Sequence, residues 1–158
     1  MSLRKPRILF VEDHEDTRDL ISFVLQQSHY EVATAATIDD SLKLARRGRF
    51  NLFIFDSWLP DGSGIDLCKK VREFDHCTPI LFYSGAAFEN DKRLALSSGA
   101  QAYLIKPVET SELLQAIKTL MVKEEIRFGV NRSERFILYR YRDKPHPACF
   151  DELAGVRF

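Results

Sequence analysis

A chain of 158 residues, 45% of them hydrophobic, is long enough to bury one proper core and to carry at most a short appendage. Lysine plus arginine equals aspartate plus glutamate at 23 each, so the net charge gives no reason to expect nucleic acid or an anionic membrane as a partner. Any partner must therefore be recognised by a local surface.

The cysteines and the hydropathy pattern favour a cytoplasmic protein. Cys68, Cys77 and Cys149 are odd in number and form no CxxC pair, which is more typical of reduced thiols than of a disulfide framework. No apolar run approaches the ~20 residues of a membrane span, and the N-terminus lacks the apolar core of a signal peptide. We therefore expect a cytoplasmic chain with no membrane partner.

Apolar runs that favour strands alternate five times with helical patterns. The expected strands cover residues 7–12, 31–36, 51–56, 80–84 and 102–105, and the expected helices cover residues 16–27, 39–46, 63–73, a segment near 90–97, and 111–122. The runs 8–11, 52–55 and 80–83 are apolar without alternation, as expected for strands covered on both faces. This pattern predicts an α/β fold with a doubly wound, five-stranded parallel sheet.

The pattern changes after about Lys123. Residues 126–130 and 135–141 have the character of two extended runs around a polar turn, and residues 143–158 show no usable periodicity. Arginines alternate with aromatic residues in the second run, but acidic residues dilute them, so a solvated strand face is favoured over a nucleic-acid surface. We expect one domain over residues 4–123 and a C-terminal extension over 124–158 with a small hairpin and an irregular tail.

Charged residues stand at the carboxyl ends of three expected strands. Asp56 lies where the apolar run 51–55 stops and the turn 58–64 begins, Glu12 and Asp13 end the first strand, and Lys106 follows the last. Parallel α/β sheets present functional groups at this edge. The complementary charges therefore suggest one site.

The spacing of Glu12-Asp13, Asp56, Ser84 and Lys106 on successive strand ends, with a proline after the lysine, resembles the receiver domain of bacterial two-component response regulators. The likeness spans roughly residues 7–122, and several linked positions make it far more specific than a single motif. It implies a flavodoxin-like receiver of the stand-alone, chemotaxis-regulator kind, with strand order 2-1-3-4-5.

The resemblance also implies a role for each matching residue. Asp56 would be the phosphoacceptor, Glu12 and Asp13 the acidic Mg²⁺ pocket, Ser84 the switch hydroxyl, and Lys106 the phosphate-binding lysine. Tyr103 would be the switch aromatic, the backbone carbonyl of Trp58 would complete the metal shell, and the bond from Lys106 to Pro107 would be cis.

Phosphoryl transfer to a carboxylate requires the same residue types. Clustered carboxylates repel one another, so Glu12, Asp13 and Asp56 stay ionised together only if a cation offsets them. Mg²⁺ suits this task because it takes hard oxygen ligands and keeps waters that can share a phosphate. A carboxylate can attack phosphorus to give an aspartyl phosphate, while a metal and a lysine neutralise charge on the equatorial oxygens.

Each of these residues also has a plainer explanation when it is taken alone. Glu12 and Asp13 could cap the following helix, Ser84 could belong to an ordinary turn, and Tyr103 could be a half-buried strand aromatic. His14, beside the acids, is better explained as an exposed first-turn residue than as a ligand, because a hard Mg²⁺ site prefers oxygen.

The resemblance implies a phosphorylation-controlled signalling module that takes a phosphoryl group from a sensor histidine kinase or a histidine phosphotransfer protein. It would be no enzyme beyond its own phosphotransfer and slow autodephosphorylation. Phosphate would draw Ser84 inward and let Tyr103 turn in, which changes the face formed by the fourth helix, fifth strand and fifth helix. An effector protein would bind this face, which is also a candidate surface for a homodimer.

Two other hypotheses stay open. The same carboxylates, Mg²⁺ and lysine would serve a small phosphohydrolase that turns over an aspartyl phosphate, although a second acid and a cap domain are not evident. Alternatively, the segment after Lys123 is an output or dimerisation element. No helix-turn-helix or enzyme domain follows residue 123, so we expect a stand-alone receiver that makes no direct contact with nucleic acid.

Overall fold

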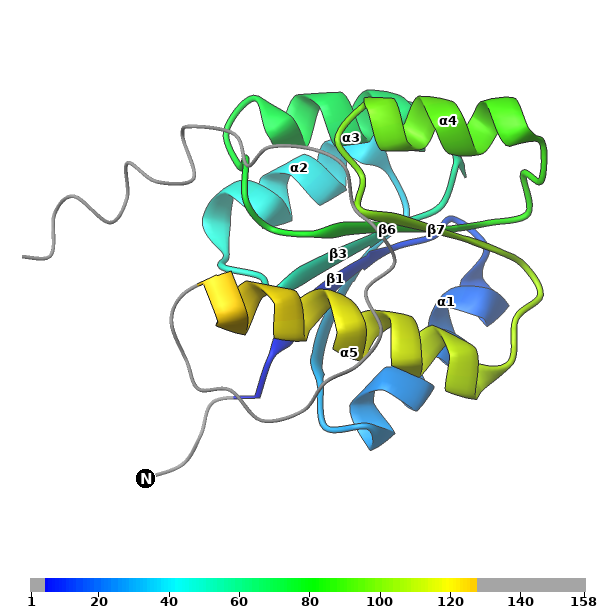
Figure 1. The fold of residues 1–158 in the computed structure, drawn as a ribbon. Helices are drawn as coiled ribbons and strands as arrows, with labels where there is room; N and C mark the ends of the chain where they lie inside the picture. Colours follow the sequence, from blue (N-terminus) through cyan, green and yellow to red (C-terminus); the bar gives the residue numbers. More distant parts are fainter. Residues whose placement is uncertain (1–4, 128–158) are drawn as a thin grey trace, which may run out of the picture.

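The computed structural model of this chain describes residues 5–127, with side chains as far as residue 122. Five parallel strands form one sheet in the order β2-β1-β3-β6-β7 (Figure 1). They are β1 (Arg7–Val11), β2 (Glu31–Ala35), β3 (Leu52–Phe55), β6 (Ile80–Ser84) and β7 (Ala102–Ile105). A separate antiparallel pair consists of β4 (Trp58–Leu59) and β5 (Gly62–Ser63). When this small hairpin is set aside, the order is the predicted 2-1-3-4-5.

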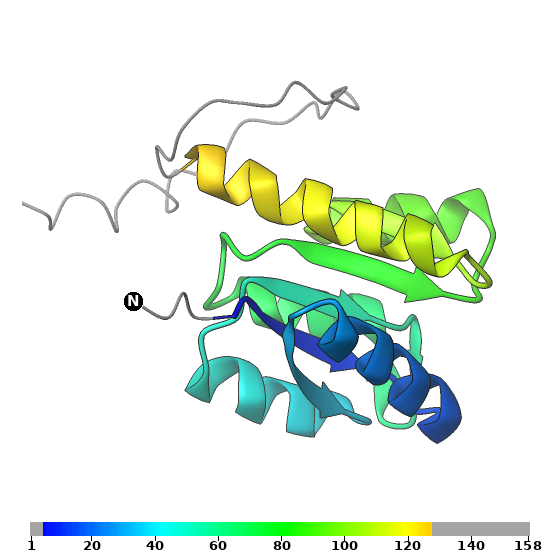
Figure 2. The ribbon, with the colours of Figure 1, turned by 90° about the horizontal axis from the view of Figure 1, so that it is seen from below.

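Five helices cover the two faces of the sheet. They are α1 (Glu15–Gln27), α2 (Ile38–Arg47), α3 (Gly64–Arg72), α4 (Glu89–Ser97) and α5 (Thr110–Arg127). Helices α2, α3 and α4 lie on one face, whereas α1 and α5 lie on the other, in front of the strands in the view from below (Figures 1 and 2). The doubly wound architecture is therefore confirmed. No helix within residues 5–127 is long and apolar enough to cross a membrane.

The sheet separates two layers of buried side chains, because alternate strand residues point to opposite faces. Leu9 and Val11 of β1 pack in the layer with α2, α3 and α4, and Ile8 and Phe10 pack in the layer with α1 and α5. All four are completely buried. Two covered faces explain why the strand sequences are apolar without alternation.

Side chains at the helix starts satisfy backbone N–H groups that have no partner within the helix. The Nδ1 of His14 accepts from the amide of Thr17 at 3.4 Å, and the hydroxyl of Thr37 accepts from the amide of Asp40 at 3.2 Å. The exposed His14 therefore acts as the N-cap of α1, directly before its first turn. The capping role considered for Glu12 and Asp13 belongs to this histidine instead.

The secondary structure departs from the sequence-based expectations at two places. The segment expected to be a simple turn after Asp56 contains the hairpin β4–β5, whose two-residue strands are too short to show a period. Helix α5 runs to Arg127, so residues 126–127, expected to begin an extended run, are helical. The helix formers Lys123, Glu124 and Glu125 explain this continuation. The rest of the expected hairpin and the irregular tail lie outside the described residues, and the domain boundary near residue 123 stays a prediction.

Two cysteines lie in the described part of the chain. Cys68 is a buried free thiol, and its burial raises its pKa. Cys77 is disulfide-bonded, so the expectation of reduced thiols is wrong at this residue. Cysteine spacing could not reveal the bond, because disulfide formation depends on how closely two Cα atoms approach in space.

Candidate functional site

The carboxyl ends of the strands bring the predicted site residues to one edge of the sheet. The sheet hydrogen bonding continues one residue past three strands: the amide of Glu12 donates to Ala35, that of Asp56 to Val11, and that of Lys106 to Ser84, at 2.8–3.0 Å. These three predicted site residues are therefore each fixed by their backbone to a neighbouring strand.

Glu12, Asp13 and Asp56 converge into one acidic cluster. A carboxylate oxygen from each residue lies within 4.8 Å of those of the other two. Glu12 and Asp56 are buried, at 2% and 7% exposure, whereas Asp13 is exposed. The backbone amide of His14 donates to Oε1 of Glu12 at 3.2 Å and orients that carboxylate. Such a cluster, closed on one side and open on the other, offers hard oxygen ligands that suit a cation such as Mg²⁺.

Lys106 supplies the positive charge beside these acids. Its Nζ forms an ion pair with Oε2 of Glu12 and lies 3.4 Å from Oδ1 of Asp56. Partial burial lowers the pKa of this ammonium, but the hydrogen bond to Glu12 and the charges of Asp56 and Glu12 outweigh it, so the pKa is raised. Lys106 is therefore held in its charged form. Its peptide bond to Pro107 is cis, as expected.

Trp58 directly contacts the proposed phosphoacceptor through its backbone. Its amide donates to Oδ2 of Asp56 at 3.2 Å, whereas its indole is 67% exposed. The two carboxylate oxygens of Asp56 thus face different partners, Lys106 on one side and the hairpin on the other.

Ser84 and Tyr103 meet at the loop that follows β6. The buried hydroxyl of Ser84 accepts from the amide of Ala86 at 3.2 Å, and the hydroxyl of Tyr103 donates to the Ala86 carbonyl at 2.7 Å. The Tyr103 ring stacks on Phe82, with 5.8 Å between centroids and 5° between planes. Tyr103 is therefore half-buried and tied to the loop that carries Ser84.

Ser57 extends this contact to the loop that begins at Asp56. Its hydroxyl lies 3.2 Å from that of Tyr103, so the aromatic residue touches the loops after both β3 and β6. The sequence analysis did not identify Ser57. Its only signal is its position directly after Asp56.

Arg18 is a second residue that sequence reasoning missed. One guanidinium nitrogen, Nη1, donates to the backbone carbonyl of Glu12 at 2.9 Å and to that of Asp13 at 3.1 Å. Arg18 lies on α1, so this helix holds the backbone of both acids. Only its position shortly after the acids hinted at this contact.

Gly64 explains how α3 begins directly against Asp56. A Cβ at this position would lie 2.0 Å from the carbonyl oxygen of Asp56, closer than any side chain allows. The Gly64 amide donates to the carbonyl of Ser57 at 2.9 Å. The glycine therefore permits a close approach that fixes the backbone on both sides of the Asp56 peptide.

Comparison with known proteins shows similarity over most of the described residues. Residues 8–118 match the family model described as the response regulator receiver domain. The chain is similar to the alkaline phosphatase synthesis transcriptional regulatory protein PhoP of Bacillus subtilis, with 34% identity over 120 residues, which cover 76% of this chain and 50% of that protein. It is also similar to the regulatory protein VanR of Enterococcus faecium, with 30% identity over 132 residues, which cover 84% of this chain and 57% of that protein.

Solved structures show the same likeness over nearly their whole length. A CheY-like response regulator receiver domain protein from Methanospirillum hungatei superimposes with a TM-score of 0.75 at 32% identity, covering 78% of this chain and 98% of that one. The chemotaxis protein CheY4 of Vibrio cholerae has a TM-score of 0.68 at 30% identity, covering 73% and 98%. By contrast, this chain spans only about half the length of the curated relatives.

Proposed function

Because this chain belongs to the response regulator receiver domain family, we propose that it is a phosphorylation-dependent switch that accepts a phosphoryl group on Asp56. The observation that carries the proposal is the convergence of three carboxylates and one lysine at a single edge of the sheet. A plain surface cluster would not place a buried acid between a lysine and two further acids.

The proposed step is an in-line displacement. A carboxylate oxygen of Asp56 forms a bond to phosphorus while the bond from phosphorus to the donor atom, the imidazole nitrogen of a phosphohistidine, breaks and leaves its electron pair on that nitrogen. Lys106, 3.4 Å from Asp56, offsets the negative charge brought by the phosphoryl oxygens. The fixed backbone of Asp56 keeps the attacking oxygen in place.

The acidic cluster fits a resident Mg²⁺. Oxygen ligands from Glu12, Asp13 and Asp56, with the backbone carbonyl of Trp58, would hold the ion. Bound there, Mg²⁺ would neutralise charge on the transferring phosphoryl group. Asp13→Ala should weaken Mg²⁺ binding, measurable by calorimetric titration. Unchanged affinity in this variant would remove Asp13 from the proposed metal shell.

The partners follow from the same chemistry. A sensor histidine kinase or a histidine phosphotransfer protein would supply the phosphoryl group, so we place the switch in the cytoplasm. Phosphate would draw Ser84 inward and let Tyr103 turn in, and an effector protein or a second copy of the chain would bind the altered surface of α4, β7 and α5. The half-buried Tyr103 on β7 supports a link between site and surface.

A labelling experiment tests the proposal. Incubation with acetyl phosphate and Mg²⁺ should give one acid-stable, base-labile phosphate, and Asp56→Asn should abolish it. Label that persists in this variant would refute the assignment. The phosphohydrolase alternative predicts continuous release of phosphate over many turnovers of substrate, whereas the switch retains a stoichiometric label.

A further inference from the structure

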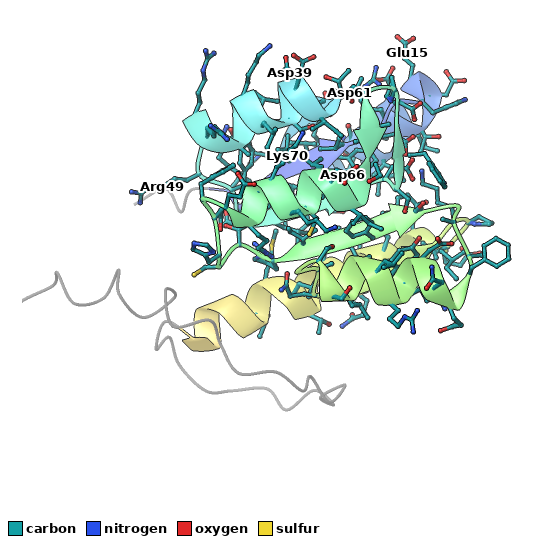
Figure 3. All side chains as sticks on the ribbon, turned by 90° about the horizontal axis from the view of Figure 1, so that it is seen from above. Glu15, Asp39, Arg49, Asp61, Asp66 and Lys70 are labelled. Carbon is teal, nitrogen blue, oxygen red and sulfur yellow. The ribbon has the colours of Figure 1, made fainter. Side chains whose placement is uncertain are left out.

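The turn of the hairpin after Asp56 is tied to a distant helix. Asp61, between β4 and β5, accepts a hydrogen bond from the amide of Ile38 at 2.8 Å through Oδ1 and one from the amide of Asp39 at 3.1 Å through Oδ2. Figure 3 shows Asp61 beside the end of α2 where Asp39 is labelled. A side chain from the phosphoacceptor loop therefore caps the start of α2.

This contact is electrostatically favourable. The first amides of a helix have no partner within it, and the N-terminus attracts negative charge. Desolvation raises the pKa of Asp61, but its hydrogen bonds with the amides of Ile38 and Asp39 outweigh that effect, so the pKa is lowered. The side-chain hydroxyl of Thr37 accepts from the next amide, that of Asp40. Asp61 and Thr37 thus cap the same helix, but only Asp61 joins it to the hairpin.

Two apolar contacts hold the hairpin in the same place. Leu59 of β4 is buried in the layer that contains α2. Gly62 of β5 has a φ of +150°, and a Cβ there would lie 2.8 Å from Cδ1 of Ile38. Ile38 itself is buried at 4% exposure. The hairpin therefore packs against the first residue of α2 as well as bonding to its amides.

The hairpin in turn fixes the backbone beside the phosphoacceptor. Trp58 pairs with Ser63 across β4 and β5, and its amide donates to Oδ2 of Asp56 at 3.2 Å. We propose that Asp61 is a positioning residue for the metal and phosphoryl site: by tethering the hairpin to α2, it holds the Trp58 backbone in register with the Asp56 carboxylate. This inference rests on the proposed function, because it assumes that Asp56 and the Trp58 carbonyl bind the metal.

Metal affinity in matched cap variants tests the inference. Mn²⁺, followed by its electron paramagnetic resonance signal, serves as the probe because its readout does not depend on the indole of Trp58. In the full chain, Asp61→Ala should bind Mn²⁺ about tenfold more weakly than the wild type, the scale on which residues that orient metal ligands act. Asp61→Asn keeps one acceptor oxygen and should lie between the two. Thr37→Ala removes a cap from the same helix without releasing the hairpin and should keep the wild-type affinity.

The outcomes separate positioning from simple capping. If Asp61→Ala and Thr37→Ala weaken Mn²⁺ binding equally, or if neither does, Asp61 is only a helix cap and the inference is overturned. Circular dichroism checks that each variant is folded. If Asp61→Ala does not fold, Asp61→Asn is compared with Thr37→Ala in its place. If the wild type itself binds no Mn²⁺, the proposed metal site fails, and the inference fails with it.

Discussion

At the scale of single residues, Lys106 allows three carboxylates to share one edge of the sheet. Its ammonium contacts Glu12 and Asp56, the two buried members of the acidic cluster. Burial of a charge is costly unless an opposite charge is close. Lys106 therefore offsets the charge of these two buried acids, and we expect it to compete with a bound metal for the same oxygens.

Lys106→Met should separate these two effects. Removing the ammonium should tighten Mg²⁺ binding, because a cation that competes for the same carboxylate oxygens is gone. Phosphorylation by acetyl phosphate should slow by roughly 100-fold, because one preorganised charge at the phosphoryl oxygens is lost. Calorimetric titration and label incorporation at saturating Mg²⁺ measure the two quantities. Lys43→Met, which removes an exposed lysine paired with Asp39 and Asp40, should change neither. Weaker Mg²⁺ binding in Lys106→Met would contradict this role.

Trp58 and Ala86 should determine how long the phosphate persists. They stand two residues after Asp56 and after Ser84, where in this family side chains help to orient the attacking water. Neither side chain offers a carboxylate or an amide group: the indole of Trp58 has only an N–H donor, and the side chain of Ala86 is a methyl group. We expect the aspartyl phosphate to decay over minutes or longer, and Trp58→Asn combined with Ala86→Glu to decay faster, by up to ~10²-fold. Loss of label at fixed Mg²⁺ is the measurement. A double variant no faster than the wild type would show that these positions do not control hydrolysis.

At the scale of secondary-structure elements, the junction between β3 and α3 depends on one glycine. Gly64→Ala would place Cβ 2.0 Å from the Asp56 carbonyl, so the helix or the strand end must shift. We expect a loss of roughly 1–3 kcal/mol in the free energy of unfolding, together with slower phosphorylation. Gly85→Ala is the matched control, because nothing lies within 4 Å of its added Cβ. It should change the free energy of unfolding by less than about 0.5 kcal/mol. Urea denaturation measures the free energy of unfolding of both variants, and an equal loss in Gly64→Ala and Gly85→Ala would refute the steric argument.

The cap that Asp61 forms on α2 should make stability depend on pH. The pKa of this carboxyl is lowered in the folded chain from its ordinary value of 3.8. A depressed folded pKa stabilises the fold above 3.8, and this stabilisation is lost as the pH falls through the folded value. The difference in unfolding free energy between the wild type and Asp61→Asn should therefore be present at neutral pH and shrink in acid. Urea denaturation across the acidic range tests this. Thr37→Ala removes an uncharged cap, so its difference should not follow the same titration.

At the scale of the whole molecule, one sheet contributes to two buried layers, so we expect the two layers to unfold as a single cooperative unit. The layer with α1 and α5 contains Ile117, and the layer with α2, α3 and α4 contains Phe55, which directly precedes Asp56. The strands contribute to both layers. Disruption of either layer should therefore unfold the site as well.

Ile117→Ala tests this cooperativity far from the site. Deleting a completely buried side chain should lower the free energy of unfolding by about 2–5 kcal/mol. Circular dichroism follows the helices and Trp58 emission follows the hairpin, and the two should give the same urea midpoint. Leu20→Ala, at an exposed position of α1, should stay within about 0.5 kcal/mol of the wild type. Separate midpoints for the two signals in Ile117→Ala would show that the layers unfold independently.

The alternation of strands and helices was predictable because it depends on local sequence patterns. Continuous apolar runs such as Leu52–Phe55 indicate strands covered on both faces, and parallel strands require helical crossovers. The two-residue strands β4 and β5 were not predictable, because so short a segment has no measurable period. The continuation of α5 to Arg127 was missed because the apolar stripe ends before the helix does.

The sequence by itself determined which residues could form the site. Asp56, Glu12, Asp13 and Lys106 stand at strand ends, and parallel strands bring such ends to one edge. Only the tertiary structure decided the contacts between loops: Ser57 with Tyr103, Arg18 with the backbone of the acids, and Asp61 with α2. These pairs are far apart in sequence or involve backbone atoms that every residue has. Their partners therefore depend on distances in the folded chain, which no spacing of residue types specifies.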